Sequence, residues 1–456
     1  MTVGSIPRHL LRFSVPMLIG NLIQIGYNVV NRIWVGNLIG ENAVGAIGVS
    51  FPVLFALIGL SMGISMASTI LIAQYYGAKD YKMVERVVGN SFSVALLVGT
   101  TLAISGMLLS NPLLKLMDTP PENFAMASSY LVISLAGFIL LYLGFLINSI
   151  LRGIGDAVTP LVFMSIGIGL NAVLDPFFIG GFGPFPSHGL NGAAYASIVS
   201  QTIAVGISVV YLNRKGHVVA FNPKKLILDG HITFLLFKIG FPTIIQQSLI
   251  SISGMFVQTF VNSFGAAGAN AYGAVLTVDM FAFMPAMSMS MAVATLTGQN
   301  LGAGRPERVK RIFKSGVMMT SSITILISII VVTLSRLILL MFGLGDDARV
   351  MDMGISYLRI AGSCYIFFAI MFISNGVING AGHTIITMVF TLLSLWLIRV
   401  PLAWFLSKTS LGIVGIWISV SCSFFVTMTI SLLYYFSGRW KKSTVIKAPS
   451  PAQLVE

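Results

Sequence analysis

Asp175 is an acidic residue inside an otherwise apolar stretch that begins near Leu161. Asn171 precedes it by four residues, so on a helix the two side chains share one face, one turn apart. A carboxylate in hydrocarbon is costly unless it is protonated, paired or open to water. Two interpretations follow. Either Asp175 binds a proton or a cation beside a substrate cavity, or it is a structural carboxylate neutralised by a neighbouring arginine.

A second group of charges lies in apolar segments of the second half of the chain. It consists of Asp279, Arg359 and Arg399. Counting residues along the predicted helices places all three at a similar depth in a membrane. Mixed charges at one depth predict an ion-pair cluster. It either stabilises the second half or forms another protonation or Na⁺ site.

A stripe of methionines accompanies Asp279. Met280, Met284, Met287 and Met291 follow one another at steps of four, three and four, which is one face of a helix, and Phe283 lies beside them. Thioethers repack around varied ligands, which makes the stripe a candidate lining for a polyspecific cavity. The alternative is that it packs in a helix core or faces lipid.

Composition identifies the class of protein. Of 456 residues, 56% are hydrophobic and 9% are charged, and the mean hydropathy is +0.92. Apolar segments of about 20 residues recur along the chain, which is typical of membrane helices and not of a barrel. The formal charge of +13 comes from basic loops between these segments, so it indicates cytoplasmic loops and not nucleic-acid binding.

Several other classes are disfavoured. Cys364 and Cys422 fall inside predicted spans, so a disulfide framework is not expected. The sequence contains no nucleophile–base arrangement, phosphate loop or nucleotide motif. This argues against an enzyme and against an ATP-driven pump, and no cofactor is expected.

We predict an all-α polytopic membrane protein with twelve transmembrane helices. The spans lie at about 10–37, 44–73, 90–110, 126–150, 158–181, 191–213, 233–262, 270–298, 314–342, 353–378, 384–407 and 411–436. Basic residues gather at the N-terminus, in alternate loops and in the tail, which places both termini in the cytoplasm.

An internal repeat divides these spans into two lobes. Ala-Gln-Tyr-Tyr-Gly-Ala-Lys at residues 73–79 matches Gly-Gln-Asn-Leu-Gly-Ala-Gly at residues 298–304, and the offset is 302 − 77 = 225. Pro16 and Pro242 nearly match as well, and each is expected to kink the first helix of its half. We predict an N-lobe at 1–213, a cytoplasmic linker at 214–232, a C-lobe at 233–437 and a disordered tail at 438–456.

With these motifs, the chain resembles the multidrug and toxic compound extrusion (MATE) family over its whole length. The resemblance rests on five stretches taken in order. They are Tyr-Asn-Val-Val-Asn-Arg-Ile-Trp-Val-Gly at 27–36, Gln-Tyr-Tyr-Gly-Ala-Lys at 74–79, Arg-Gly-Ile-Gly-Asp-Ala-Val-Thr-Pro at 152–160, Leu-Asn-Ala-Val-Leu-Asp-Pro at 170–176 and Gly-Gln-Asn-Leu-Gly-Ala-Gly-Arg-Pro at 298–306. It implies two six-helix lobes around a cavity, and export of organic cations or amphipathic drugs in exchange for H⁺ or Na⁺.

The resemblance also implies a coupling site. Carried over by position, it falls on Asn171, Asp175 and Asn31, with Ser197 or Ser200 as the hydroxyl, and Na⁺ would bind at Asp175 and Asn171. Members with this motif usually carry Asp where this chain has Asn31. The neighbouring Arg32 either pairs with Asp175, which would hold the carboxylate ionised, or extends toward the headgroups and leaves Asp175 available.

Two rival functions stay open. A flippase for a lipid-linked sugar would need cationic residues in its cavity, and Arg32, Arg359 and Arg399 are the candidates. A membrane receptor or channel component is a second rival, against which the two-lobed repeat counts. The expected partners are a small-molecule substrate and membrane lipids. Nucleic acid is not an expected partner. The protein is expected in the plasma membrane of a bacterium or archaeon, where a monomer would be sufficient for function.

Overall fold

The computed structural model describes residues 1–181, 186–214, 219–345, 347–442 and 445, apart from the side chains of residues 32, 41 and 42. Ten of its helices are long and apolar enough to cross a membrane. Two bent pairs, each with an angle of 47°, raise this number to twelve if each pair is one span. The prediction of an all-α protein with twelve membrane-spanning segments is confirmed.

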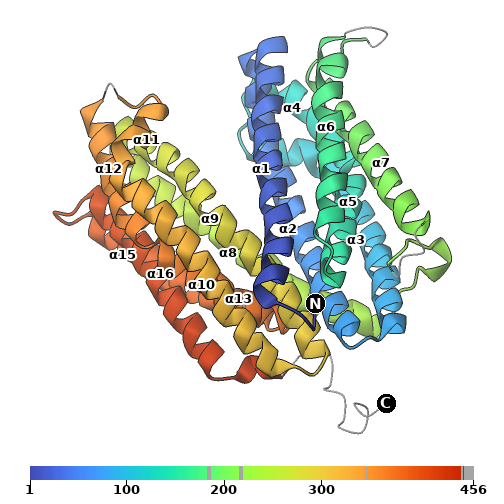
Figure 1. Cartoon of the computed structure of the whole chain (residues 1–456). Coiled ribbons are helices and arrows are strands. Elements are labelled where there is room, and N and C mark those ends of the chain that lie inside the picture. Colours follow the sequence, from blue (N-terminus) through green and yellow to red (C-terminus); the bar gives the residue numbers. More distant parts are fainter. Residues whose placement is uncertain (182–185, 215–218, 346, 443–444, 446–456) are drawn as a thin grey trace. The chain divides into compact units, whose positions relative to one another are not determined.

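The described residues of the first half form seven α-helices and a short 3-10 turn. They are α1 (Ile6–Leu38), α2 (Glu41–Gly77), α3 (Tyr81–Leu116), α4 (Pro121–Ala136), α5 (Phe138–Ile154), α6 (Val158–Gly180), α7 (Leu190–Arg214) and η1 (Pro223–Lys225). Figure 1 labels the helices α1 to α7. Helices α4 and α5 are the first bent pair and form the fourth predicted span.

The second half repeats this plan with more interruptions. It contains α8 (Gly230–Asn262), α9 (Gly265–Gly302), α10 (Pro306–Thr333), α11 (Ser335–Met341), α12 (Ala348–Ser363), α13 (Tyr365–Gly380), α14 (Thr384–Leu392), the π-helix η2 (Leu393–Arg399), α15 (Val400–Ser407), α16 (Ile413–Phe436) and η3 (Arg439–Lys441). Helices α12 and α13 form the second bent pair. The two bends fall at Gly137 and Cys364, a separation of 364 − 137 = 227, which agrees with the sequence repeat.

The chain divides into two compact units, Pro16–Phe241 and Met1–Val15 with Pro242–Glu456. The unit boundaries therefore fall inside α1 and α8, at the two prolines of the repeat, and not in the loops around residues 213 and 233. Pro removes a helix hydrogen bond, so a helix changes direction most readily at such a residue.

Close packing of α6 on α7 shapes the interior of the unit Pro16–Phe241. A Cβ atom on Gly192 of α7 would lie 2.2 Å from the backbone oxygen of Phe178 in α6, so only glycine allows this approach. Small residues that bring two backbones together are a usual means of holding helices in a membrane. The buried Ile179 and Leu190 pack in the same apolar cluster. This packing fixes α6, which carries Asn171 and Asp175, against α7, which carries Ser197.

Aromatic stacking dominates the interior of the other unit. The ring of Tyr272 stacks on Trp417 with centroids 5.6 Å apart, and Tyr357 meets the same indole edge-on at 4.9 Å. Phe283 stacks on Phe368 at 3.7 Å. Tyr357 also donates a hydrogen bond to Asp279, so this aromatic packing helps to hold the helices around the C-lobe carboxylate.

The predicted disordered tail needs a correction at its start. Arg439–Lys441 form a 3-10 turn, and Trp440 is only 1% exposed. Its Nε1 donates a hydrogen bond of 2.8 Å to the backbone oxygen of Tyr435, whose ring it stacks on. The buried indole anchors the chain as far as this turn. Residues 443–444 and 446–456 lie outside the described part.

Candidate functional site

Helix α6 places Asn171 and Asp175 on one buried face. The exposed fractions of the two residues are 6% and 0%. Asn171 Nδ2 donates a hydrogen bond of 2.9 Å to Asp175 Oδ1, as their spacing of four residues predicts. A carboxylate buried in this way has given up its hydration, so its remaining contacts decide its state.

Helices α1 and α7 complete a polar network around Asn171. The hydroxyl of Tyr27 and the hydroxyl of Ser197 both donate to Asn171 Oδ1, the second at 3.2 Å. Asn31 Nδ2 donates to the Tyr27 hydroxyl oxygen at 3.2 Å. Ser200, the alternative hydroxyl, bonds within its own helix to Ala196 O. The structure thus joins the four predicted coupling residues through one network.

The network has more acceptors than donors. Asp175 Oδ2 and Asn31 Oδ1 are buried and have no hydrogen-bond partner among the described residues. An unsatisfied buried acceptor is costly, and a carboxylate oxygen especially so. A proton or a cation would relieve this deficit. The two unpartnered oxygens thus agree with the prediction that this network binds a proton or a cation.

Arg32 is the residue that could neutralise Asp175 permanently, and its side chain lies outside the described part. Among the described side chains, no ion pair within 4.0 Å includes Asp175. The interpretation of Asp175 as an exchangeable carboxylate and that of a permanent pair with Arg32 both remain predictions.

Tyr27 is a member of the network that the sequence analysis did not assign to the site. It precedes Asn31 by four residues, so the helical period that groups Asn171 with Asp175 also groups these two. It is the only residue of the described network that bonds to both Asn31 and Asn171. The four-residue spacing of Tyr27 and Asn31 is the sequence signal that indicates this role of Tyr27.

Under the transport activity that the family resemblance implies, Tyr27→Phe is expected to slow transport while leaving the protein folded. The change removes the donor to Asn171 Oδ1 and the acceptor for Asn31 Nδ2, each worth about 0.5–1.5 kcal/mol. We expect initial uptake rates to fall by about two- to tenfold, since 1.4 kcal/mol is a factor of ten. Rates per folded molecule in vesicles provide the measurement. Ser200→Ala is the matched control, and an equal loss in that variant would remove the special role of Tyr27.

The C-lobe carboxylate has other partners than the N-lobe one, and in the described part of the chain these partners are tyrosines and not the predicted arginines. Asp279 is 5% exposed and accepts hydrogen bonds from the hydroxyls of Tyr357 and Tyr365, one on each oxygen. Among the described residues, no ion pair within 4.0 Å joins it to Arg359 or Arg399. Both oxygens of this carboxylate therefore have a phenol donor, and its assignment to a structural or a coupling role remains a prediction.

The two arginines have other environments. Arg399 Nε donates to Ser423 Oγ at 2.8 Å, and its guanidinium lies 5.1 Å from the ring centre of Phe424. The π-helix Leu393–Arg399 ends at this residue, and such irregular turns change the direction in which a side chain leaves the helix. Arg359 is exposed. Sequence spacing placed the three charges at one depth but could not give their directions.

The methionine stripe is divided between surface and core. Met280 and Met287 are 57% and 47% exposed, whereas Met284 is 6% exposed. Phe283 packs against Tyr365, Phe368 and Phe424 inside its unit. Exposed Met280 and Met287 are thus free to contact a ligand or lipid, and Met284 and Phe283 support them. The assignment of these four residues to a substrate cavity remains a prediction.

Comparison with known proteins identifies relatives over the whole chain. The family model described as MatE matches residues 16–177 and again 242–405, so both halves match it. The probable multidrug resistance protein YoeA of Bacillus subtilis is 31% identical over 448 residues, which cover 97% of this chain and 96% of the relative. The probable multidrug resistance protein NorM of Thermotoga maritima is 28% identical over 451 residues, covering 97% and 95%.

Solved structures share the fold. A MOP superfamily transporter from Pyrococcus furiosus, described as having a binding pocket of reversed polarity that suggests a different function, superposes with a TM-score of 0.88 at 25% identity. The match covers 96% of this chain and 97% of that one. An outward-facing multidrug resistance transporter also gives a TM-score of 0.88, at 24% identity and with coverage of 95% and 96%.

Proposed function

Because this chain belongs to the MATE family of membrane transporters, we propose that it exports organic cations and other amphipathic drugs in exchange for H⁺ bound at Asp175. Relatives named as multidrug resistance and multidrug export proteins support the efflux activity. Asn171, Asn31, Tyr27 and Ser197 position the carboxylate. No enzymatic step is involved, because the family consists of transporters.

One observation carries the coupling proposal. Asp175 Oδ2 is buried and has no partner among the described residues, while Oδ1 is held by Asn171. A carboxylate in a membrane interior is expected to bind its counter-charge or its proton as part of function. The contrast with Asp279, which has a donor on each oxygen, favours the N-lobe carboxylate as the exchanging group.

The contacts favour a proton over Na⁺. Asp175 Oδ2 and Asn31 Oδ1 are two acceptors that lack a donor. Protonation of Oδ2 turns one of these acceptors into a donor. Hard cations are held by several oxygens at once. Here Asn171 Oδ1 already accepts from two hydroxyls, and the described residues contain no cluster of three or more His, Cys, Asp or Glu side chains. Only Asp175 Oδ2 and Asn31 Oδ1 are without a partner in the described network, which is fewer oxygens than a hard cation usually takes from a protein.

Exchange at Asp175 explains how a proton gradient would drive export. The ionised carboxylate attracts a cationic drug, and the protonated one does not. Drug binds from the side where protons are scarce, and protonation from the other side favours its release there. Alternating access of two repeat-related lobes separates the two events. The coupling requires only that drug and proton have different affinities in the two states.

The exported molecule should move away from the cytoplasm. The basic loops and the basic N-terminal segment predict a cytoplasmic location for both termini of this multi-pass protein, in the plasma membrane of its cell. Inverted vesicles therefore present the loading side to the medium. Export then appears as uptake, which can be driven by a proton gradient set up across the vesicle membrane.

Uptake of a fluorescent organic cation such as ethidium into inverted vesicles tests the function. We expect an inward-acidic proton gradient to drive uptake, a Na⁺ gradient at equal pH to drive little, and a protonophore to abolish the signal. Vesicles without the protein are the control. Uptake driven only by Na⁺ would contradict the choice of ion. The absence of uptake under both gradients would contradict drug–cation exchange.

A flippase for an anionic lipid-linked substrate is the alternative that such an absence would favour. It needs cations gathered at a cavity. Arg399 is engaged with Ser423 and Phe424, and Arg359 is exposed without an ion pair in the described part of the chain. These contacts do not gather positive charge, so the cation exporter remains the better supported proposal.

A further inference from the structure

Each half of the chain begins with a similar short helical segment that has a buried apolar face. Residues 4–15 precede Pro16 and residues 230–241 precede Pro242, an offset of 242 − 16 = 226. At this offset, the paired residues are Gly4 with Gly230, Ile6 with Ile232, Leu10 with Leu236, Arg12 with Lys238 and Phe13 with Ile239. The similarity predicts that the two segments have equivalent structural roles in the two halves.

Each segment belongs to the compact unit of the other half. Met1–Val15 are grouped with Pro242–Glu456, and residues 230–241 are grouped with the first half in Pro16–Phe241. Yet residues 6–15 are continuous with α1, and residues 230–241 are continuous with α8. The first helix of each half therefore starts in one unit and continues in the other, and the change falls at Pro16 and Pro242.

An apolar face and two arginines attach the first segment. Ile6, Leu10 and Phe13 are 7%, 0% and 1% exposed, and their spacing makes one helix face. Arg305 Nη1 donates to Thr2 O at 2.9 Å, and Arg308 Nη2 donates to Gly4 O at 2.7 Å. Both arginines stand at the beginning of α10, the third helix of the second half.

The second segment is attached at the corresponding place, the beginning of α3. Ile232, Leu236 and Ile239 are 2%, 0% and 2% exposed, which repeats the buried face of the first segment. Arg86 Nη2 lies 2.7 Å from Asp229 Oδ2. Asn90, fully buried in α3, accepts from the Asp229 backbone amide at 2.7 Å.

Asp229 keeps its charge at neutral pH because of its place at the start of α8. The backbone amide of Ile232, with that of His231 and the charge of Arg86, holds the pKa of Asp229 below its usual range. A carboxylate ahead of a helix N-terminus also interacts favourably with the helix dipole. Asp229 is therefore ionised, as the ion pair with Arg86 requires.

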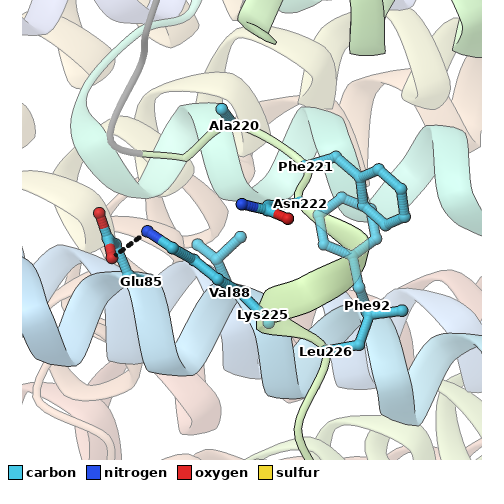
Figure 2. Close-up of a pocket in the computed structure, with 9 residues that line it drawn as sticks. Glu85, Val88, Phe92, Ala220, Phe221, Asn222, Lys225 and Leu226 are labelled. Atoms are coloured by element: carbon cyan, nitrogen blue, oxygen red, sulfur yellow. Dashed lines mark hydrogen bonds and ion pairs between the residues drawn. The ribbon is translucent and has the colours of Figure 1, made fainter.

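The chain leading into this segment is fitted onto α3 as well, as Figure 2 shows. Lys225 Nζ pairs with Glu85 Oε2 at 2.7 Å, and the ring of Phe221 meets Phe92 edge-on at 4.9 Å. A Cβ on Gly89 would lie 2.2 Å from Lys225 O, so glycine permits the contact. These contacts pack the linker against α3, beside a cavity of ≈ 80 Å³.

We propose that the segments 4–15 and 230–241 are paired latches on the cytoplasmic side, whose release from α10 and α3 is a step of alternating access. Each latch connects the first helix of one half to the body of the other half through a continuous helix. Rearrangement of the two halves must then either bend the helix at its proline or detach the segment. The proposal rests on the transport function proposed above.

A reversible cross-link of the second latch tests the step. Cys364 and Cys422 are first replaced by Ser, and Arg86→Cys with Asp229→Cys is then joined by a short bis-thiosulfonate reagent. We expect the cross-linked protein to lose uptake and to regain it on reduction. Asn111→Cys with Ser128→Cys, which joins α3 to α4 where the native side chains are 2.6 Å apart, is the matched control and should keep its uptake when linked. Full uptake by the completely cross-linked latch pair would overturn the proposal.

Hydrogen exchange gives a second test that does not depend on transport. Arg86→Gln removes the ion pair by which α3 holds Asp229, the residue just before the latch. Exposed ion pairs contribute little free energy, so we expect exchange at residues 230–241 to quicken by only about two- to fivefold. Residues 171–179 of the same unit should be unchanged. If residues 230–241 exchange as slowly in the variant as in the wild type, the latch reading fails. If exchange quickens in Arg86→Gln but neither the wild type nor any variant takes up the cation, the proposed transport function is wrong and the attachment of the latch to α3 is not.

Discussion

Asp175→Asn should abolish proton-driven uptake while leaving a folded protein. The amide keeps the size of the carboxyl group but can neither ionise nor exchange a proton. Coupling free energies between two sites are typically about 1–3 kcal/mol, a factor of ~5 to 150. We therefore expect uptake under an inward-acidic gradient to fall at least about tenfold. Uptake rates at equal amounts of folded protein in inverted vesicles provide the measurement.

A matched comparison separates coupling from folding. In the variant, the amide oxygen at position 175 can still accept the hydrogen bond that Asn171 Nδ2 donates to Asp175 in the wild type. The local packing of α6 is therefore retained. Melting temperatures of the two proteins should agree closely. Wild-type uptake by the variant would make Asp175 structural and would leave the proposed proton site without its central group.

Asp279→Ala should destabilise the protein more than any change at the N-lobe site. The substitution leaves the hydroxyls of Tyr357 and Tyr365 without their acceptor, and Tyr357 is only 1% exposed. A buried group left unpaired costs about 1–3 kcal/mol, so two such groups cost roughly 2–6 kcal/mol. We expect a fall in melting temperature of about 5 °C or more, measured by fluorescence in detergent.

The same variant should keep its coupling. Molecules of Asp279→Ala that remain folded are expected to show proton-driven uptake, because Asp279 does not exchange its counter-charge in this account. The double change Tyr357→Phe with Tyr365→Phe is the companion variant, since it leaves the carboxylate without donors. Unchanged stability together with lost proton dependence in Asp279→Ala would identify the C-lobe carboxylate as the coupling group.

Much of the fold follows from the sequence because its signals are local and strong. Long apolar segments predict helices, and the paired motifs at 73–79 and 298–304 predict two similar halves. The same holds for Asn171 and Asp175, whose contact is set by one turn of helix. What the sequence shows less directly is where one unit ends, because residues 4–15 and 230–241 are grouped with the opposite half.

For the three C-lobe charges, the sequence predicts the depth in the membrane but not the contacts of the side chains. Residue counting gave Asp279, Arg359 and Arg399 a common depth, but ion pairing also requires that the side chains point at one another. A π-helix ends at Arg399, and the aromatic packing of Tyr357 and Tyr365 supplies the actual partners of Asp279. Neither feature has a strong sequence signal, since tyrosines in membrane helices have many roles.

Proton release on drug binding tests the central claim most directly. Purified protein in detergent and weak buffer is mixed with ethidium while a pH indicator dye follows the medium. We expect the wild type to release a proton as the cation binds, and Asp175→Asn to bind the cation without proton release. Asp279→Ala should release as the wild type does. Equal proton release by wild type and Asp175→Asn would contradict exchange at Asp175.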